Sequence, residues 1–281
     1  MARQKVYIGV DLQPNLFRFV VVNHRGKILM SGERQIEGDG HSWSHEFATI
    51  LQNDEDRETE ALIEQSERVW GFAPSFASGV TRSIFIPSEA RPVKNYVEWE
   101  TSIYMGDSAD HFFLSWEMGP AVAGGNQLHL TSVRREEFQG FAAGLSNAGV
   151  LPVLIEGTLV SAYNALSREA KKKKLPPLAI ALKEGELYRI GYFEKGSLMQ
   201  QSIVKASENE FADQLLQFFQ SGSYAPAMLY HQIDELVDEE KVSEFSSAIS
   251  IPVLPLPAGA HVSSLFAVAH SVALRTKEVD Q

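Results

Sequence analysis

The sequence predicts an α/β protein built from two related lobes, and two stretches carry this prediction. Residues 6–33 read as three short apolar strands, separated by the turn sequences Gln13-Pro14-Asn15 and His24-Arg25-Gly26-Lys27. Residues 178–204 repeat the pattern in a weaker form about 170 residues further along the chain. Two such β-meanders indicate a duplicated α/β architecture with one meander in each lobe.

The composition is that of an ordinary folded protein and excludes several kinds of site. The chain has 281 residues, of which 44% are hydrophobic and 22% charged, so it can bury a large core. Its net charge of −11 argues against broad nucleic-acid binding and against an anionic membrane surface. It contains no cysteine, which excludes disulfides, cysteine-based zinc sites and thiol catalysis.

No segment of the sequence is typical of membrane insertion. No apolar run approaches the roughly 18–20 residues of a transmembrane helix. The opening residues MARQKVYIGVD read as a first strand and not as a signal peptide, because Asp11 interrupts the apolar run.

The polar stretch after the first meander predicts two helices. The first covers 43–51 on an amphipathic spacing, and the second covers 61–70 and ends near Gly71. His41 and His45 are four residues apart, which leaves a metal site conceivable. A solvated helix face is the favoured interpretation, since nothing else in the sequence converges on the two histidines.

Residues 76–134 predict a β-α-β-β unit with a small sheet of its own. A strand at 80–87 ends in a proline, a helix begins at Pro92-Val93 and keeps helical spacing to Ile103, and a strand at 110–118 has one aromatic face. Gly124-Gly125-Asn126 then forms a hairpin turn that leads into a return strand at 128–133.

The chain then alternates between helices and strands to its end. A helix at 135–148 ends at Gly149, and a buried strand at 150–156 precedes a helix at 158–174. Four lysines from Lys171 end that helix; a solvated terminus is favoured over a phosphate or membrane contact. After the second meander there is room for one helix, near 211–219, before a strand at 227–230.

The order of these motifs carries a resemblance to a known family. The motifs are the strand that ends at Pro87, the Val-Glu-Trp-Glu run at 97–100, the strands around Trp116, the sequence Val-Arg-Arg-Glu at 133–136, and the Gly-Val-Leu-Pro-Val run at 149–153. Together with residues 264–275, which are similar to the family's last helix, they resemble the type IV pilus assembly protein PilM, a cytoplasmic actin-like family. The cytoplasmic part of the type II secretion protein GspL has the same plan and is the nearest alternative.

The resemblance implies an actin-like (ribonuclease H-like) two-lobe fold with an inserted subdomain. The first lobe would cover residues 1–170, with the inserted β-α-β-β subdomain at about 72–134, and the second lobe 171–281. The second lobe would be reduced, because only about 20 residues separate Val204 from the strand at Ala227. That length accommodates one helix and not the full fourth subdomain that encloses a nucleotide.

Three parts of the family's nucleotide site are degraded in this sequence. Actin-like ATPases need a glycine and a small hydroxyl residue just after the first Asp, whereas Asp11 is followed by Leu12-Gln13-Pro14-Asn15. Proline also removes a backbone donor. The second meander lacks the expected Asp-x-Gly, since 180–185 reads Ile-Ala-Leu-Lys-Glu-Gly, and the Gly-Gly adenosine turn is replaced by His-Gln-Ile-Asp at 231–234.

These departures favour a protein that uses no cofactor, a pseudo-ATPase. Any vestigial nucleotide site would contain Asp11, Gln13, Asn15 and Lys183. The alternative is an active actin-like ATPase that binds ATP with Mg²⁺ and whose nucleotide state gates assembly. Other enzyme classes are disfavoured, because the sequence contains no Gly-x-Ser-x-Gly motif and no glycine fingerprint after a strand.

The resemblance further implies a protein partner. It is the short cytoplasmic N-terminal segment of the inner-membrane protein PilN, held between the first lobe and the inserted subdomain. Here that groove would be lined by Gly79, Thr81, Ser83, Tyr96, Trp99 and Ile103. The aromatic residues among them also suit a subdomain core, which is the simpler interpretation of each one taken alone.

The function implied by the resemblance is that of a non-catalytic adaptor. It would serve the inner-membrane platform of a type IV pilus or type II secretion system and contact other platform proteins. It would be cytoplasmic, peripheral at the inner membrane through its partner, and would have neither a transmembrane segment nor a nucleic-acid ligand.

Overall fold

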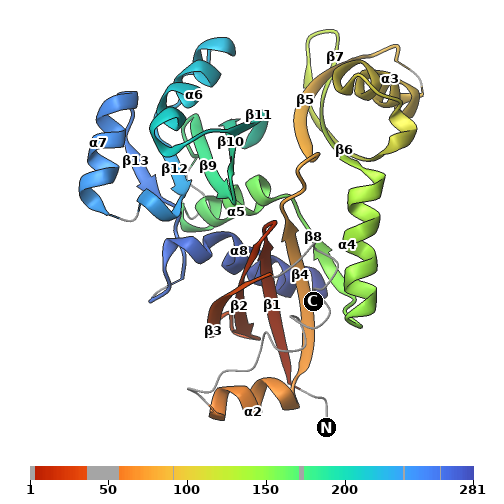
Figure 1. Cartoon of the computed structure of the whole chain (residues 1–281). Coiled ribbons are helices and arrows are strands. Elements are labelled where there is room, and N and C mark those ends of the chain that lie inside the picture. The colour runs from red at the N-terminus through yellow and green to blue at the C-terminus, as the bar shows by residue number, and fades with distance from the viewer. Residues whose placement is uncertain (1–3, 37–56, 91, 171–173, 237, 260) are drawn as a thin grey trace.

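The computed structural model describes residues 4–36, 57–90, 92–170, 174–236, 238–259 and 261–281. It contains two five-stranded sheets and one three-stranded sheet, with helices α5 (Thr158–Glu169) and α8 (Ala267–Asp280) between the two larger sheets (Figure 1). The α/β two-lobe architecture predicted from the two meanders is confirmed.

The sheet of the first lobe has the strand order β3-β2-β1-β4-β8. Its strands are β1 (Lys5–Leu12), β2 (Leu16–Asn23), β3 (Ile28–Gln35), β4 (Glu67–Pro74) and β8 (Pro152–Ile155). The first three pair antiparallel through tight turns, as the meander predicts, and β4 and β8 add parallel strands to the sheet.

The helix predicted at 61–70 is wrong in its second half. Helix α2 covers Arg57–Gln65, and the chain then enters β4, which pairs in parallel with β1. Six consecutive residues of β4, from Val69 to Pro74, are buried. A strand that is buried on both faces has no alternation, so its apolar run cannot be distinguished from a buried helix by periodicity. The helix predicted at 43–51 lies outside the described residues.

The β-α-β-β unit lies between β4 and helix α4, at the upper right of Figure 1. Its elements are β5 (Val80–Pro87), α3 (Val93–Met105), a 3₁₀ turn (Ala109–His111), β6 (Phe112–Val122) and β7 (Gly125–Arg134), and the sheet order is β5-β7-β6. Helix α3 packs on one face of this sheet over a core of Ile84, Ile86, Val97, Leu128 and Leu130.

The chain returns to the first lobe through α4 (Arg135–Asn147) and β8. Gly149 follows α4 with φ +66°, the left-handed conformation that the predicted helix end requires. The strand predicted here exists, but it is not buried. It is the last strand of the sheet, and the exposed fractions of Leu151, Val153 and Ile155 are 85%, 43% and 41%.

The sheet of the second lobe has the order β11-β10-β9-β12-β13. Its strands are β9 (Leu178–Glu184), β10 (Leu187–Glu194), β11 (Ser197–Lys205), β12 (Leu229–Gln232) and β13 (Val253–Pro255). One face is covered by α6 (Glu208–Ser221) and α7 (Glu239–Ile249), the other by α5 and α8. Helix α7 and the 3₁₀ turn Asp234–Leu236 before it are not predicted from the sequence.

Helix α8, which a 3₁₀ turn (Ser264–Phe266) precedes, runs from the second lobe across the sheet of the first. Two glycines let its backbone approach the strands. A Cβ atom on Gly9 of β1 would lie 2.1 Å from the carbonyl oxygen of Ala269 and 2.2 Å from the amide nitrogen of Ala273. A Cβ atom on Gly71 of β4 would lie 1.9 Å from Oγ1 of Thr276.

Replacing Gly9 by alanine is therefore expected to displace α8. Because the new methyl group meets backbone atoms that cannot rotate away, we expect a loss of about 3 kcal/mol or more in the free energy of unfolding. Urea unfolding measures this loss. Gly157→Ala is the control, since a Cβ atom there meets nothing within 4 Å, and it should cost less than about 1 kcal/mol. Equal effects of the two substitutions would contradict the close contact of α8 and β1.

Candidate functional site

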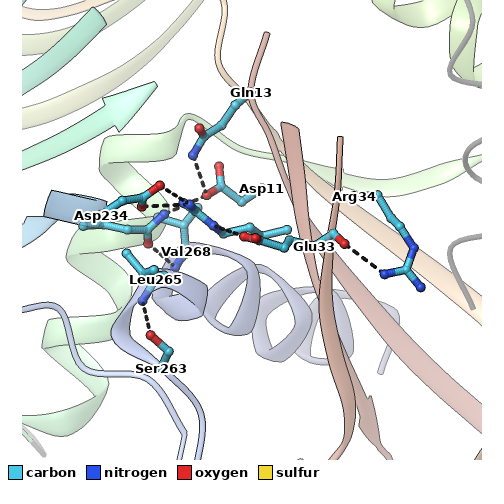
Figure 2. A network of polar contacts seen from close by, with 10 residues as sticks. Asp11, Gln13, Glu33, Arg34, Asp234, Ser263, Leu265 and Val268 are labelled. Atoms are coloured by element: carbon cyan, nitrogen blue, oxygen red, sulfur yellow. Dashed lines mark hydrogen bonds and ion pairs between the residues drawn. The ribbon is translucent and has the colours of Figure 1, made fainter. Parts of the chain in front are cut away.

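A buried arginine of β2 lies where the two lobes meet. Arg18 is opposite Asp11 of β1 in the antiparallel register, and both side chains are buried. Nη2 of Arg18 donates to both carboxylate oxygens of Asp234, at 2.8 and 3.0 Å, and Nε donates to Glu33 of β3 at 3.3 Å. Asp234 comes from the 3₁₀ turn after β12, so this ion pair joins the second lobe to the first (Figure 2).

Asp11 takes part in a second contact between the lobes. Its carboxylate accepts a hydrogen bond of 2.8 Å from Nε2 of Gln232 and a longer one of 3.4 Å from Nε2 of Gln13. The amide oxygen of Gln232 accepts from the backbone N–H of Val268 in the first turn of α8, at 3.2 Å. Gln232 therefore links β1, β12 and α8. Burial raises the pKa of Asp11 to about 6, against the opposing effect of the Arg18 charge.

A second buried arginine holds the inserted unit against the second lobe. Nε of Arg189 on β10 donates to both carboxylate oxygens of Glu184 at 2.9 Å. Its other two nitrogens each donate at 2.8 Å, one to the carbonyl oxygen of Gly79 and one to that of Phe76. These carbonyls belong to the link between β4 and β5, so Arg189 fixes the path by which the chain enters the inserted unit.

The residues predicted for a vestigial nucleotide site are distributed over this region. Asp11 and Gln13 are bonded to each other, Lys183 forms an ion pair with Glu235, and Asn15 is exposed in the turn between β1 and β2. Asp11 and Lys183 thus already have partners within the protein. The carboxylates around Arg18 outnumber it three to one (Asp11, Glu33 and Asp234).

The described part of the chain holds no group of three or more His, Asp or Glu side chains arranged to bind a metal ion. His41 and His45, which the sequence left open as a metal site, lie outside the described residues.

The structure separates the residues predicted for the peptide groove into two sets. Thr81 bonds to Thr131 of β7 at 2.9 Å, and Ser83 bonds to His129 at 2.8 Å and to the carbonyl oxygen of Leu198 at 2.9 Å. Both therefore point away from α3, whose core contacts alternate with them along β5. The carbonyl oxygen of Gly79 is occupied by Arg189 and by Gln201.

The predicted residues of α3 lie on the other side of the small sheet. Tyr96 packs against the subdomain core, and its ring centroid is 5.6 Å from that of Trp99. Trp99 and Ile103 are 54% and 62% exposed, and the neighbouring Tyr104 is 45% exposed with its ring 4.1 Å from the guanidinium of Arg82. We call Trp99, Ile103 and Tyr104 the α3 patch. The α3 patch and Ser83 do not share a face of the sheet.

The sequence does not predict the pairing of Arg18 with Asp234 or of Arg189 with Glu184 in the interlobe region. One signal was available: each arginine stands inside an otherwise apolar strand, LFRFVVVN and LYRIGYFE. A buried guanidinium needs carboxylate or carbonyl partners. The positions of those partners could not be read from the sequence.

Comparison with known proteins finds similarity in structure. No protein-family model and no curated protein sequence matches the chain. A solved structure described as the PilM-PilN type IV pilus biogenesis complex matches with a TM-score of 0.75 at 15% identity, over 96% of this chain and 98% of that one. The cytoplasmic domain of EpsL, an inner-membrane component of the type II secretion system of Vibrio cholerae, matches with a TM-score of 0.55 at 13% identity, over 96% and 95%.

A Bacteroides thetaiotaomicron protein described as having an actin-like ATPase fold and unknown function also matches, with a TM-score of 0.56 at 12% identity over 95% of each chain. The chain thus has an actin-like fold, and the resemblance to PilM and to the secretion protein is confirmed at the level of the fold. No helix in the described ranges has the length and hydropathy needed to cross a bilayer.

Proposed function

We propose that this protein is a non-catalytic adaptor of an inner-membrane assembly platform, of a type IV pilus or a type II secretion system. On this proposal it binds the cytoplasmic N-terminal segment of a PilN-like membrane protein and works at the cytoplasmic side of the inner membrane. The observation that carries the proposal is the network that joins the two lobes through Arg18, Asp234, Asp11 and Gln232.

The network supports the proposed absence of ATP hydrolysis because the protein's own side chains bond to one another between the lobes, where a nucleotide would bind. A nucleotide with Mg²⁺ would have to separate Arg18 from Asp234 and Asp11 from Gln232. Breaking these buried, charge-assisted contacts costs on the order of several kcal/mol, which is comparable to the whole binding free energy of a micromolar ligand. In addition, Pro14 has no backbone N–H, so the turn after β1 lacks one hydrogen-bond donor for a phosphate.

The α3 patch supports binding of a protein segment. Large exposed apolar side chains that lie together on a surface are typical of interaction sites, and aromatic residues are frequent anchors. Trp99 and Ile103 are one helical turn apart and both are more than half exposed. We therefore place the apolar side chains of the partner segment on the α3 patch.

Calorimetric titration with ATP and Mg²⁺ tests the first half of the proposal. We expect no saturable heat at nucleotide concentrations up to the millimolar range and no shift in melting temperature. A one-to-one isotherm with micromolar affinity would instead support the active actin-like ATPase and overturn the pseudo-ATPase proposal.

Fluorescence anisotropy with a labelled PilN-like N-terminal peptide tests the second half. We expect Trp99→Glu to weaken binding about tenfold or more, because it removes an aromatic anchor and places a charge in an apolar contact. Val279→Glu is the matched control, since Val279 is also about half exposed but lies near the end of α8. If Ile155→Glu abolishes binding and Trp99→Glu does not, the peptide binds to the exposed edge strand β8 and not to the α3 patch.

A further inference from the structure

A second apolar surface lies on the other lobe, between α6 and α7. A cleft of about 320 Å³ opens there, with Tyr188, Phe211, Ile233, Leu236, Phe245 and Ala248 among the residues that line it. Three aromatic rings form a layered wall: the ring centroids of Tyr188 and Phe211 are 4.0 Å apart, and those of Phe211 and Phe245 are 5.6 Å apart. Tyr188 and Phe211 are each only 2% exposed, so an incoming apolar side chain would meet the partly exposed Leu236 and Phe245 and the exposed Ala248.

The rim of this cleft is charged, and its surroundings are strongly acidic. Glu235, Lys241 and Glu244 complete the lining. Glu235 is paired with Lys183, whereas Glu244 is exposed and has no ion-pair partner among the described residues. Residues 206–250, which include both helices, contain nine acidic residues and one lysine, a net charge of −8 out of −11 for the whole chain. Most of the net negative charge thus lies in the segment that contains α6 and α7.

We propose that the cleft between α6 and α7 is a docking site for a basic amphipathic segment of a partner protein. An apolar side chain of the segment packs against Phe245, Leu236 and Ala248, and its lysine or arginine side chains lie over Glu244 at the rim. Charge complementarity selects this occupant, because the same carboxylates repel nucleotides and acidic peptides. The site goes beyond the adaptor function proposed above, since it gives the protein a second binding surface on the lobe opposite the α3 patch.

The test uses the full chain and a labelled synthetic peptide with leucine and arginine at helical spacing. The matched probe carries glutamate in place of arginine. At about 0.15 M salt, where distant charges are screened, we expect the arginine peptide to bind about tenfold or more tightly than the glutamate peptide. Equal affinity of the two peptides, or no binding of the arginine peptide, would overturn the proposal.

Two substitutions locate the site. Ala248 is exposed at the cleft, so Ala248→Arg should block and repel the peptide without affecting the core, and Glu244→Lys should reverse the charge of the rim. Each should weaken binding about tenfold. Glu240→Lys makes the same charge change on α7 at an exposed position that does not line the cleft, and it should change the affinity less than about threefold. Equal losses in Glu240→Lys and Glu244→Lys would show nonspecific attraction and would overturn docking in the cleft.

This outcome is separable from that of the adaptor proposal. Trp99→Glu should leave binding of the arginine peptide unchanged, and Ala248→Arg should leave binding of the PilN-like peptide unchanged.

Discussion

Replacing Arg18 by methionine is expected to lower the free energy of unfolding by about 3–5 kcal/mol at neutral pH. The substitution keeps an unbranched side chain in the core but removes the guanidinium from between Asp11, Glu33 and Asp234. Three carboxylates then face one another without a cation, and the contact between β2 and the turn after β12 is lost. Urea unfolding monitored by tryptophan fluorescence measures the change.

The control for this prediction is Arg25→Met, which removes an arginine that is exposed in the turn between β2 and β3. It should change stability by less than about 0.5 kcal/mol. A milder variant, Asp234→Asn, keeps the shape of the partner but removes its negative charge. If the interlobe contact is formed in solution, the double variant Arg18→Met/Asp234→Asn should lose less stability than the sum of the losses in the two single variants. Additive losses would show that Arg18 and Asp234 do not interact.

Replacing Arg189 by methionine is expected to lower stability by a similar amount, about 3–5 kcal/mol. It removes four hydrogen bonds and leaves the buried Glu184 carboxylate with one hydrogen-bond donor among the described residues, Oγ1 of Thr158 at 2.9 Å. The substitution should also affect the two parts of the first lobe unequally. Because Arg189 binds the carbonyls of Phe76 and Gly79, amide exchange in β5 should become faster, while exchange in β1 changes less.

Two variants separate this role from general destabilisation. Gln201→Ala removes a single hydrogen bond of 2.7 Å to Gly79 and should cost about 1 kcal/mol. Arg68→Met changes an exposed arginine on β4 and should be nearly neutral. Uniformly faster exchange in Arg189→Met throughout both lobes would contradict a specific role in holding the inserted unit.

Some features of the candidate site depend on adjacent residues and can be predicted from the sequence, whereas others depend on contacts between distant residues and cannot. The missing backbone N–H in the turn Leu12-Gln13-Pro14-Asn15 is readable from the sequence, because proline has no N–H whatever the fold. The contact between Arg18 and Asp234 spans 216 residues, and no local pattern specifies it. The predicted groove shows the same limit: Ser83 and Trp99 were placed correctly on a strand and a helix, yet they lie on opposite sides of the small sheet.

The sequence by itself determined both meanders and the β-α-β-β unit, because turns and strand composition are properties of a few adjacent residues. Only the tertiary structure decided that 67–74 is a central strand, that β8 is an exposed edge, and which carboxylates surround Arg18 and Arg189. The physical reason is that an apolar run can be buried as a helix or as a strand. Likewise, a buried charge selects its partners through distance in space and not through distance along the chain.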